Sequence, residues 1–138
     1  MKTSRHQERI WAMQLIYSLD LTGDLDISTA RERIRQLKEQ EMLSPDKKYY
    51  FEELVEGVLA NRAELDEIIR QKALGWDFER IGYLEKSILR IALFELQSGI
   101  PVGVAINEAV ELAKNYIDEK SARFINGILA DKTSPGEQ

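Results

Sequence analysis

Cysteine is absent from the 138-residue chain, and histidine occurs only once, as His6. Without cysteine the chain cannot form a disulfide framework, a thiolate zinc site or a thiol nucleophile. A single imidazole near the start of the chain argues against a catalytic triad and against a histidine-based metal site. The lack of cysteine is compatible with a reducing cytoplasm, where we expect the protein to act.

Long apolar runs are missing as well. No stretch approaches the ~20 residues of a membrane-spanning helix, and Glu8 and Asp20 bracket the first apolar segment, unlike a signal peptide. The chain also has no glycine-rich phosphate loop. Glu108 and Glu111 stand three residues apart but lack the Glu-x-x-His pairs of di-metal bundles. We therefore expect no membrane association, no cofactor, no metal and no enzymatic activity.

Positive charge is scarce overall but concentrated at the start of the chain. Nineteen basic and 24 acidic residues give a formal net charge of −5, which is unusual for a protein that binds nucleic acid over its whole surface. The first nine residues, in contrast, contain only one acid, Glu8, beside Lys2, Arg5, His6 and Arg9. These cations, with Tyr17 further along the same predicted helix, are typical ingredients of single-stranded RNA recognition. A merely solvated N-terminus is the alternative.

A second basic and aromatic group is formed by Lys120, Arg123 and Phe124. Lys120 and Arg123 are helix neighbours at a spacing of three, so they can present two cations together, whereas periodicity alone favours a core position for Phe124. Arg90 stands inside an apolar run and needs either an ion pair, with Glu85, Glu95 or a carboxylate of the next helix, or a ligand.

Apolar residues recur at helical spacing through most of the chain, which predicts an all-α fold of about seven helices. Ser44 and Pro45 predict a helix start, Asn61 either a new start or a continuation, and Asp118 the cap of the last helix. Val104 is an expected core residue. We expect one domain over residues 1–131, with subdomains of about 1–62 and 63–131, and a flexible tail at 132–138.

Three motifs in the C-terminal half, together with Ala12, Gln14 and Tyr17 near the start, resemble the NusB family of bacterial transcription antitermination factors. In order and spacing they are W-x-FERI-x₂-LEKSILRIALFEL from residue 76, IP-x₂-VAINEAVELAK from residue 100 and SARFINGIL from residue 121. The resemblance spans nearly the whole chain, although residues 22–48 match only in being helical and charged.

The resemblance implies an all-helical fold of two small packed bundles and a protein without catalytic activity of its own. NusB-like proteins bind NusE, which is also a ribosomal small-subunit protein, and the pair binds the boxA element of nascent RNA. Their complex joins other Nus factors on RNA polymerase and promotes read-through, notably of ribosomal RNA operons. Some family members dimerise, so the resemblance leaves monomer and homodimer open.

Carried over position by position, the resemblance assigns RNA contacts to Lys2, Arg5, His6, Arg9, Tyr17, Glu79, Tyr83, Lys120, Arg123 and Phe124. It assigns partner contacts to Tyr17 and Glu85. The N-terminal helix of the family is often rich in arginine, and Gln7 and Glu8 dilute that pattern here. Asn107, Glu108 and Asn126 are motif positions without an assigned role.

Two other readings stay open at this point. Some ribosomal RNA methyltransferases carry a NusB-like N-terminal module, but no methyl-donor motif follows Asp131. A protein-only scaffold that has lost its RNA surface would fit the diluted N-terminus. If about three to five cations act on RNA, the salt dependence should have a slope of only about −2 to −3.5 for a single strand.

Overall fold

The computed structural model describes residues 3–130. Over this range the chain forms seven α-helices, one short 3₁₀ helix and no strand, which confirms the all-α prediction. In chain order the elements are α1 (Arg5–Leu21), α2 (Ile27–Gln40), α3 (Tyr50–Ala60), α4 (Arg62–Lys72), η1 (Phe78–Arg80), α5 (Tyr83–Gln97), α6 (Val102–Tyr116) and α7 (Glu119–Ala130). None of these helices combines the length and the apolar character that crossing a bilayer requires. Lys2 and the predicted tail at 132–138 lie outside the described residues.

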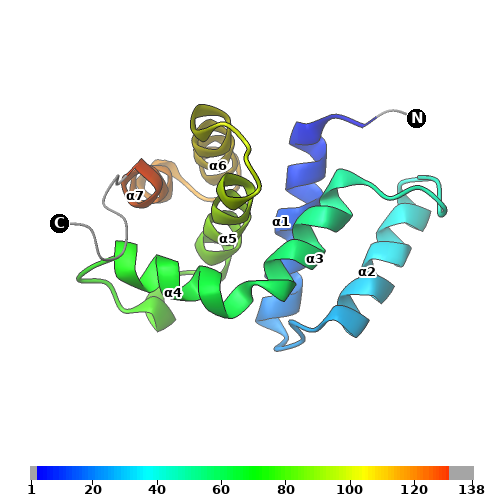
Figure 1. Ribbon diagram of the computed structural model, residues 1–138, viewed down its shortest axis with the longest axis horizontal. Helices are drawn as coiled ribbons and strands as arrows, with labels where there is room; N and C mark the ends of the chain where they lie inside the picture. The colour runs from blue at the N-terminus through cyan, green and yellow to red at the C-terminus, as the bar shows by residue number, and fades with distance from the viewer. Residues whose placement is uncertain (1–2, 131–138) are drawn as a thin grey trace.

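Helix α5 lies at the centre of the molecule and packs against α1, α3, α4, α6 and α7 (Figure 1). Every residue from Lys86 to Leu93 is buried, which places the middle of this helix in the core. One continuous cluster of buried hydrophobic residues draws on all seven α-helices. The subdomain boundary near residue 62 stays a prediction, and Asn61 does form the junction between α3 and α4.

Arg90 is a buried cation that ties three helices together. Its Nε and Nη2 atoms donate to the Asp66 carboxylate of α4 at 2.7 and 3.0 Å, and Nη1 donates to Asp20 of α1 at 2.8 Å. Burial opposes the charge, but the hydrogen bonds that Arg90 donates to Asp66 and Asp20 outweigh it and raise the pKa of Arg90 above its ordinary value. The predicted ion pair is confirmed, with partners other than Glu85 and Glu95.

Local sequence signals place some helix ends correctly. Pro101 directly precedes α6, and the Asp118 carboxylate accepts a hydrogen bond from the Ser121 amide at 2.7 Å, as expected for an N-cap. Val104, in contrast, is a wrong core prediction because its side chain is exposed and Ala105 is buried in its place.

The helix start predicted at Ser44 and Pro45 is also wrong, since α3 begins only at Tyr50. Lys38 of α2 donates from Nζ to the carbonyl oxygens of Pro45 and Lys47 at 3.3 and 2.8 Å. The Ser44 amide donates to the Tyr49 hydroxyl at 2.9 Å. The Ser44 amide and the Pro45 and Lys47 carbonyls thus find hydrogen-bond partners without forming a helix, so this segment is a loop.

Gly57 is where α3 approaches α5 most closely. A Cβ atom at this position would lie 2.1 Å from the Phe94 ring, too short for any real contact. Gly127 of α7 is a matched case on the surface, because a Cβ atom there would meet nothing within 4 Å.

The same substitution should therefore have opposite effects at these two glycines. Gly57→Ala should lower the free energy of unfolding by about 1–2 kcal/mol, because overpacking outweighs the better helix propensity of alanine. Gly127→Ala should raise it by up to about 1 kcal/mol. Urea denaturation followed by circular dichroism measures both, and stabilisation by Gly57→Ala would contradict the close α3–α5 packing.

Candidate nucleic-acid interface

The predicted basic residues at the start of α1 separate into surface and interior positions. Ser4 caps the helix by accepting from the Gln7 amide at 3.0 Å. Arg5 is exposed, and its guanidinium carbon lies 3.7 Å from the centre of the Tyr50 ring. His6 is partly exposed, and its Nδ1 atom lies 2.9 Å from a carboxylate oxygen of Glu108 on α6. Glu108, unassigned from sequence, thus joins α6 to α1.

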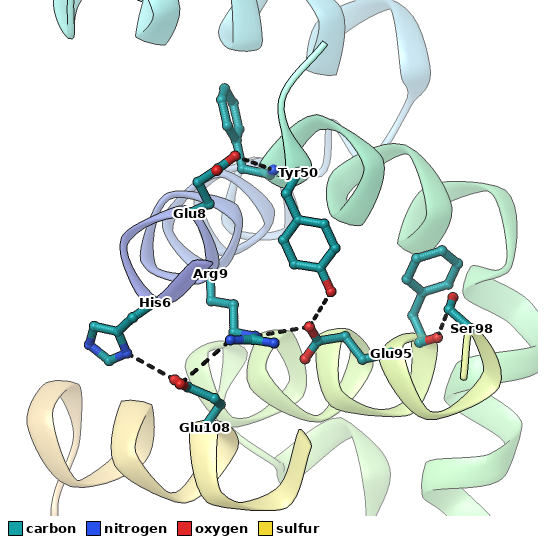
Figure 2. Close-up of polar contacts among 9 residues, drawn as sticks. His6, Glu8, Arg9, Tyr50, Glu95, Ser98 and Glu108 are labelled. Atoms are coloured by element: carbon teal, nitrogen blue, oxygen red, sulfur yellow. Dashed lines mark hydrogen bonds and ion pairs between the residues drawn. The ribbon is translucent and has the colours of Figure 1, made fainter. Parts of the chain in front are cut away.

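Arg9 points into the protein rather than into solvent. Its side chain is only 5% exposed, with Nε 2.9 Å from the Glu95 carboxylate and Nη1 3.5 Å from Glu108 (Figure 2). The Tyr50 hydroxyl donates to the same Glu95 oxygen, so one buried carboxylate connects α1, α3 and α5. In this arrangement the Arg9 guanidinium pairs with two carboxylates inside the protein and does not point toward solvent.

Glu8, which dilutes the basic stretch in the sequence, is buried as well. One carboxylate oxygen accepts from the Phe51 amide at 3.0 Å, and the other accepts from the Thr3 hydroxyl at 2.7 Å. Phe51 lies in the first turn of α3, where free amides and the helix dipole favour a negative charge. The surface of this turn is therefore more basic than its sequence indicates.

The Tyr50 hydroxyl stays protonated in this network. Burial, and then the hydrogen bond to Glu95, raise the pKa of Tyr50 well above its ordinary value of 10. The hydroxyl consequently acts as a donor, and the ring beneath Arg5 carries no charge.

Three further predicted residues, Glu85, Lys120 and Phe124, lie together at the opposite end of α5. A groove of about 250 Å³ lies between the start of α5 and the start of α7. It is lined by Trp76, Arg80, Ile81, Gly82, Glu85, Lys120, Ser121 and Phe124. The Trp76 and Phe124 rings meet edge to face with their centres 4.8 Å apart, and Trp76 is 60% exposed.

Glu85 is oriented within this groove by its neighbours. Its Oε2 atom accepts from the Ser121 hydroxyl of α7 at 3.0 Å. Its carboxylate also folds back over Gly82, where a Cβ atom would lie 2.3 Å away, so a larger residue at this position would require the carboxylate to shift. The carboxylate therefore presents fixed acceptor oxygens beside the two aromatic rings and two cations, Arg80 and Lys120.

Residues around the groove are held by cation–π contacts. Phe78 of η1 is buried between the Arg70 guanidinium, 4.2 Å from the ring centre, and the Lys86 ammonium, 4.5 Å away. Glu79, the next residue along η1, points outward with a side chain that is 75% exposed. Its carboxylate oxygen lies 3.8 Å from the Arg70 guanidinium.

Tyr83, Arg123 and Tyr17 complete the placement of the predicted residues. Tyr83 is exposed at the first turn of α5, and Arg123 is exposed on α7 next to Phe124. Tyr17 is partly exposed on α1 and lines neither the groove nor the Arg5 surface. The assignments of all these residues to RNA or partner contacts stay predictions.

Sequence reasoning missed Trp76, Arg80 and Tyr50 as site residues. Trp76 follows Gly75, which has a positive φ of 85°, and a large aromatic directly after such a turn was a usable signal. Tyr50 gave no such signal, because its relation to Arg5 depends on the packing of α3 against α1.

The two surfaces lie along one helix. Glu85 and Glu95 are ten residues apart on α5, which corresponds to about 15 Å along its axis. Among residues 3–130 no group of three or more acidic or histidine side chains is placed to hold a metal ion. What the geometry offers is an exposed cation stacked on an aromatic ring at one end of α5 and, at the other end, a groove with cations, aromatic rings and an oriented carboxylate. These features suit recognition of an unpaired nucleic-acid strand.

Comparison with known proteins agrees with this fold. The model of the NusB family matches residues 6–133. The transcription antitermination protein NusB of Halothermothrix orenii is 54% identical over 130 residues, covering 94% of this chain and 96% of that protein.

Solved structures give the same assignment. NusB of T. maritima superimposes with a TM-score of 0.75 at 29% identity, covering 99% of this chain and 97% of that one. A crystal structure of the antitermination factors NusB and NusE in complex with double-stranded RNA gives a TM-score of 0.74 at 28% identity, covering 93% and 96% of the two chains. The chain therefore belongs to the NusB family.

Proposed function

We propose that this protein is an RNA-binding adaptor for transcription antitermination. Together with NusE, the ribosomal small-subunit protein, it would recognise the boxA element of nascent RNA and join other Nus factors on RNA polymerase. Read-through of ribosomal RNA operons in the cytoplasm would be the outcome. In this role the protein binds its partners and catalyses no reaction. The proposal holds for a monomer and for a homodimer.

The observation that carries this proposal is the groove between α5 and α7. Trp76 and Phe124 offer ring faces and edges for bases, and Arg80 and Lys120 lie where they can meet phosphates. The Glu85 carboxylate can accept hydrogen bonds from amino groups on base edges. Aromatic side chains stack on bases that are unpaired and unstacked from their neighbours, and bases inside a duplex are neither. The groove therefore favours a single strand.

The charge pattern supports a shared RNA surface. Arg9, Lys38, Lys86 and Arg90 are buried, so they do not contribute to phosphate binding. The few exposed cations near the groove and at Arg5 give weak RNA affinity by themselves. A basic partner bound to the acidic remainder of the chain would supply the missing phosphate contacts. The net charge of −5 would attract such a partner.

Addition of NusE should therefore tighten binding to RNA by at least about tenfold, since linked contacts act at high effective concentration. Fluorescence anisotropy of a labelled single-stranded boxA-like RNA, titrated with and without NusE, measures this. The same sequence annealed into a duplex is the control and should bind more weakly. Equal affinity in the presence and absence of NusE would contradict the cooperative model, and no RNA binding in either titration would favour a protein-only scaffold.

The cations of α7 should act through phosphates. Lys120→Ala combined with Arg123→Ala should weaken binding and make the slope of log affinity against log salt less negative by about 1.4, or about 0.7 per lost contact on a single strand. Arg31→Ala is the matched control, because Arg31 is an exposed cation on α2, away from both surfaces. An unchanged slope in the double variant would remove α7 from the RNA interface.

Substitution of Arg5 and substitution of Arg9 should have different effects on stability, although the two residues are only four apart on α1. Arg9→Ala leaves the Glu95 carboxylate buried without its cation, which should lower the free energy of unfolding by about 3 kcal/mol. Arg5→Ala should cost less than about 1 kcal/mol, the value of an exposed cation–π contact, while weakening RNA binding. Urea denaturation measures the first effect, and a stable Arg9→Ala variant would show that Arg9 is not a structural cation.

A further inference from the structure

We propose that Tyr50 is a positioning residue for RNA binding, which holds the Arg5 guanidinium stacked on its ring so that the N–H donors of Arg5 face an RNA phosphate. This inference rests on the proposed function and adds to it a residue, from α3, that no motif of the sequence indicates. Tyr50 would act through Arg5 and need not touch the RNA itself.

The contact between the two side chains leaves the donors of Arg5 free. A distance of 3.7 Å between the guanidinium carbon and the ring centre is van der Waals contact. Tyr50 thus covers part of the guanidinium through its ring, without taking a hydrogen bond from it. In the described part of the chain no acidic side chain is paired with Arg5, in contrast to Arg35, Arg9 and Arg90. The planar fork of Arg5 is therefore available for bidentate binding of a phosphate.

The ring under Arg5 is fixed at both of its ends. Its backbone is the first residue of α3, and its hydroxyl donates to Glu95, whose carboxylate is 1% exposed and paired with Arg9. Arg9 also lies 5.8 Å from the ring centre, on the inner side of the network. The ring cannot turn without breaking the hydrogen bond to a buried charge.

The backbone of Arg5 is fixed to the same junction. Glu8, one turn further along α1, accepts from the Phe51 amide next to Tyr50, and His6 contacts Glu108 of α6. Both partners of the Arg5–Tyr50 stack are thus held before RNA arrives. Because the side-chain entropy of Arg5 is already largely lost, phosphate binding costs less, and we expect the stack to contribute about three- to tenfold in affinity.

A double-mutant cycle tests whether Tyr50 acts through Arg5. The variants are Tyr50→Leu, Arg5→Ala and their combination, and the readout is the anisotropy of a fluorescein-labelled single-stranded boxA-like RNA at one salt concentration. Tyr50→Leu should weaken binding about three- to tenfold in the parent and should have no further effect in the Arg5→Ala background. Tyr50→Phe, which keeps the ring, should restore most of the affinity, and Tyr116→Leu is the matched control on an exposed tyrosine of α6.

Each result is decisive. An equal loss from Tyr50→Leu in both backgrounds, or no loss at all while Arg5→Ala weakens binding, overturns the inference and leaves the proposed function intact. If Arg5→Ala is itself without effect, the inference also fails. Absence of RNA binding by the parent protein, both with and without NusE, overturns both.

A second measurement does not depend on how well Tyr50→Leu folds. In NMR spectra of the parent protein, the side-chain protons of Arg5 should be shifted upfield by the ring current of Tyr50, and they should remain so after RNA is added. Ordinary shifts for these protons in the parent protein would overturn the inference directly.

Discussion

The structure depends on the burial of a central helix that carries charges. Helix α5 is enclosed by five other α-helices, yet Lys86, Arg90 and Glu95 lie within it. A buried charge without a partner costs several kcal/mol, so each must be met by a group from a surrounding element. Lys86 lies over the Phe78 ring, Arg90 binds carboxylates of α4 and α1, and Glu95 binds Arg9 and Tyr50. Meeting all three charges at once ties α5 to α1, α3, α4 and η1 by specific contacts in addition to apolar packing.

This requirement also shapes both candidate binding surfaces. At one end of α5 the pairing of Glu95 draws Arg9 and Tyr50 inward and leaves Arg5 outside, stacked on the same ring. At the other end Lys86 and Arg70 clamp Phe78, and the short η1 segment therefore presents Glu79 and Arg80 to solvent. Structural charges and candidate binding charges are thus neighbours in sequence and differ in how deeply they are buried.

The sequence predicts the helical class and the Asp118 cap because these depend on local periodicity and capping, and it leaves open whether a new helix starts at Asn61. It fails at Ser44 and Pro45 because Lys38 and Tyr49 satisfy the polar groups of that loop from a distance. The same limit applies to the site. Motif positions identify Glu85, Lys120 and Phe124, which the fold brings together in one groove. They cannot distinguish Arg5 from Arg9, because the carboxylate that captures Arg9 is 86 residues away along the chain.

The two tryptophans of the chain occupy opposite environments. Trp11 is 9% exposed and packs edge-on against Phe51 in the core, whereas Trp76 is 60% exposed in the groove beside Phe124. Their intrinsic emission therefore reports on different events, since Trp11 senses opening of the core and Trp76 senses occupation of the groove. The protein carries its own pair of optical probes, by which loss of a ligand can be distinguished from loss of the fold without any label.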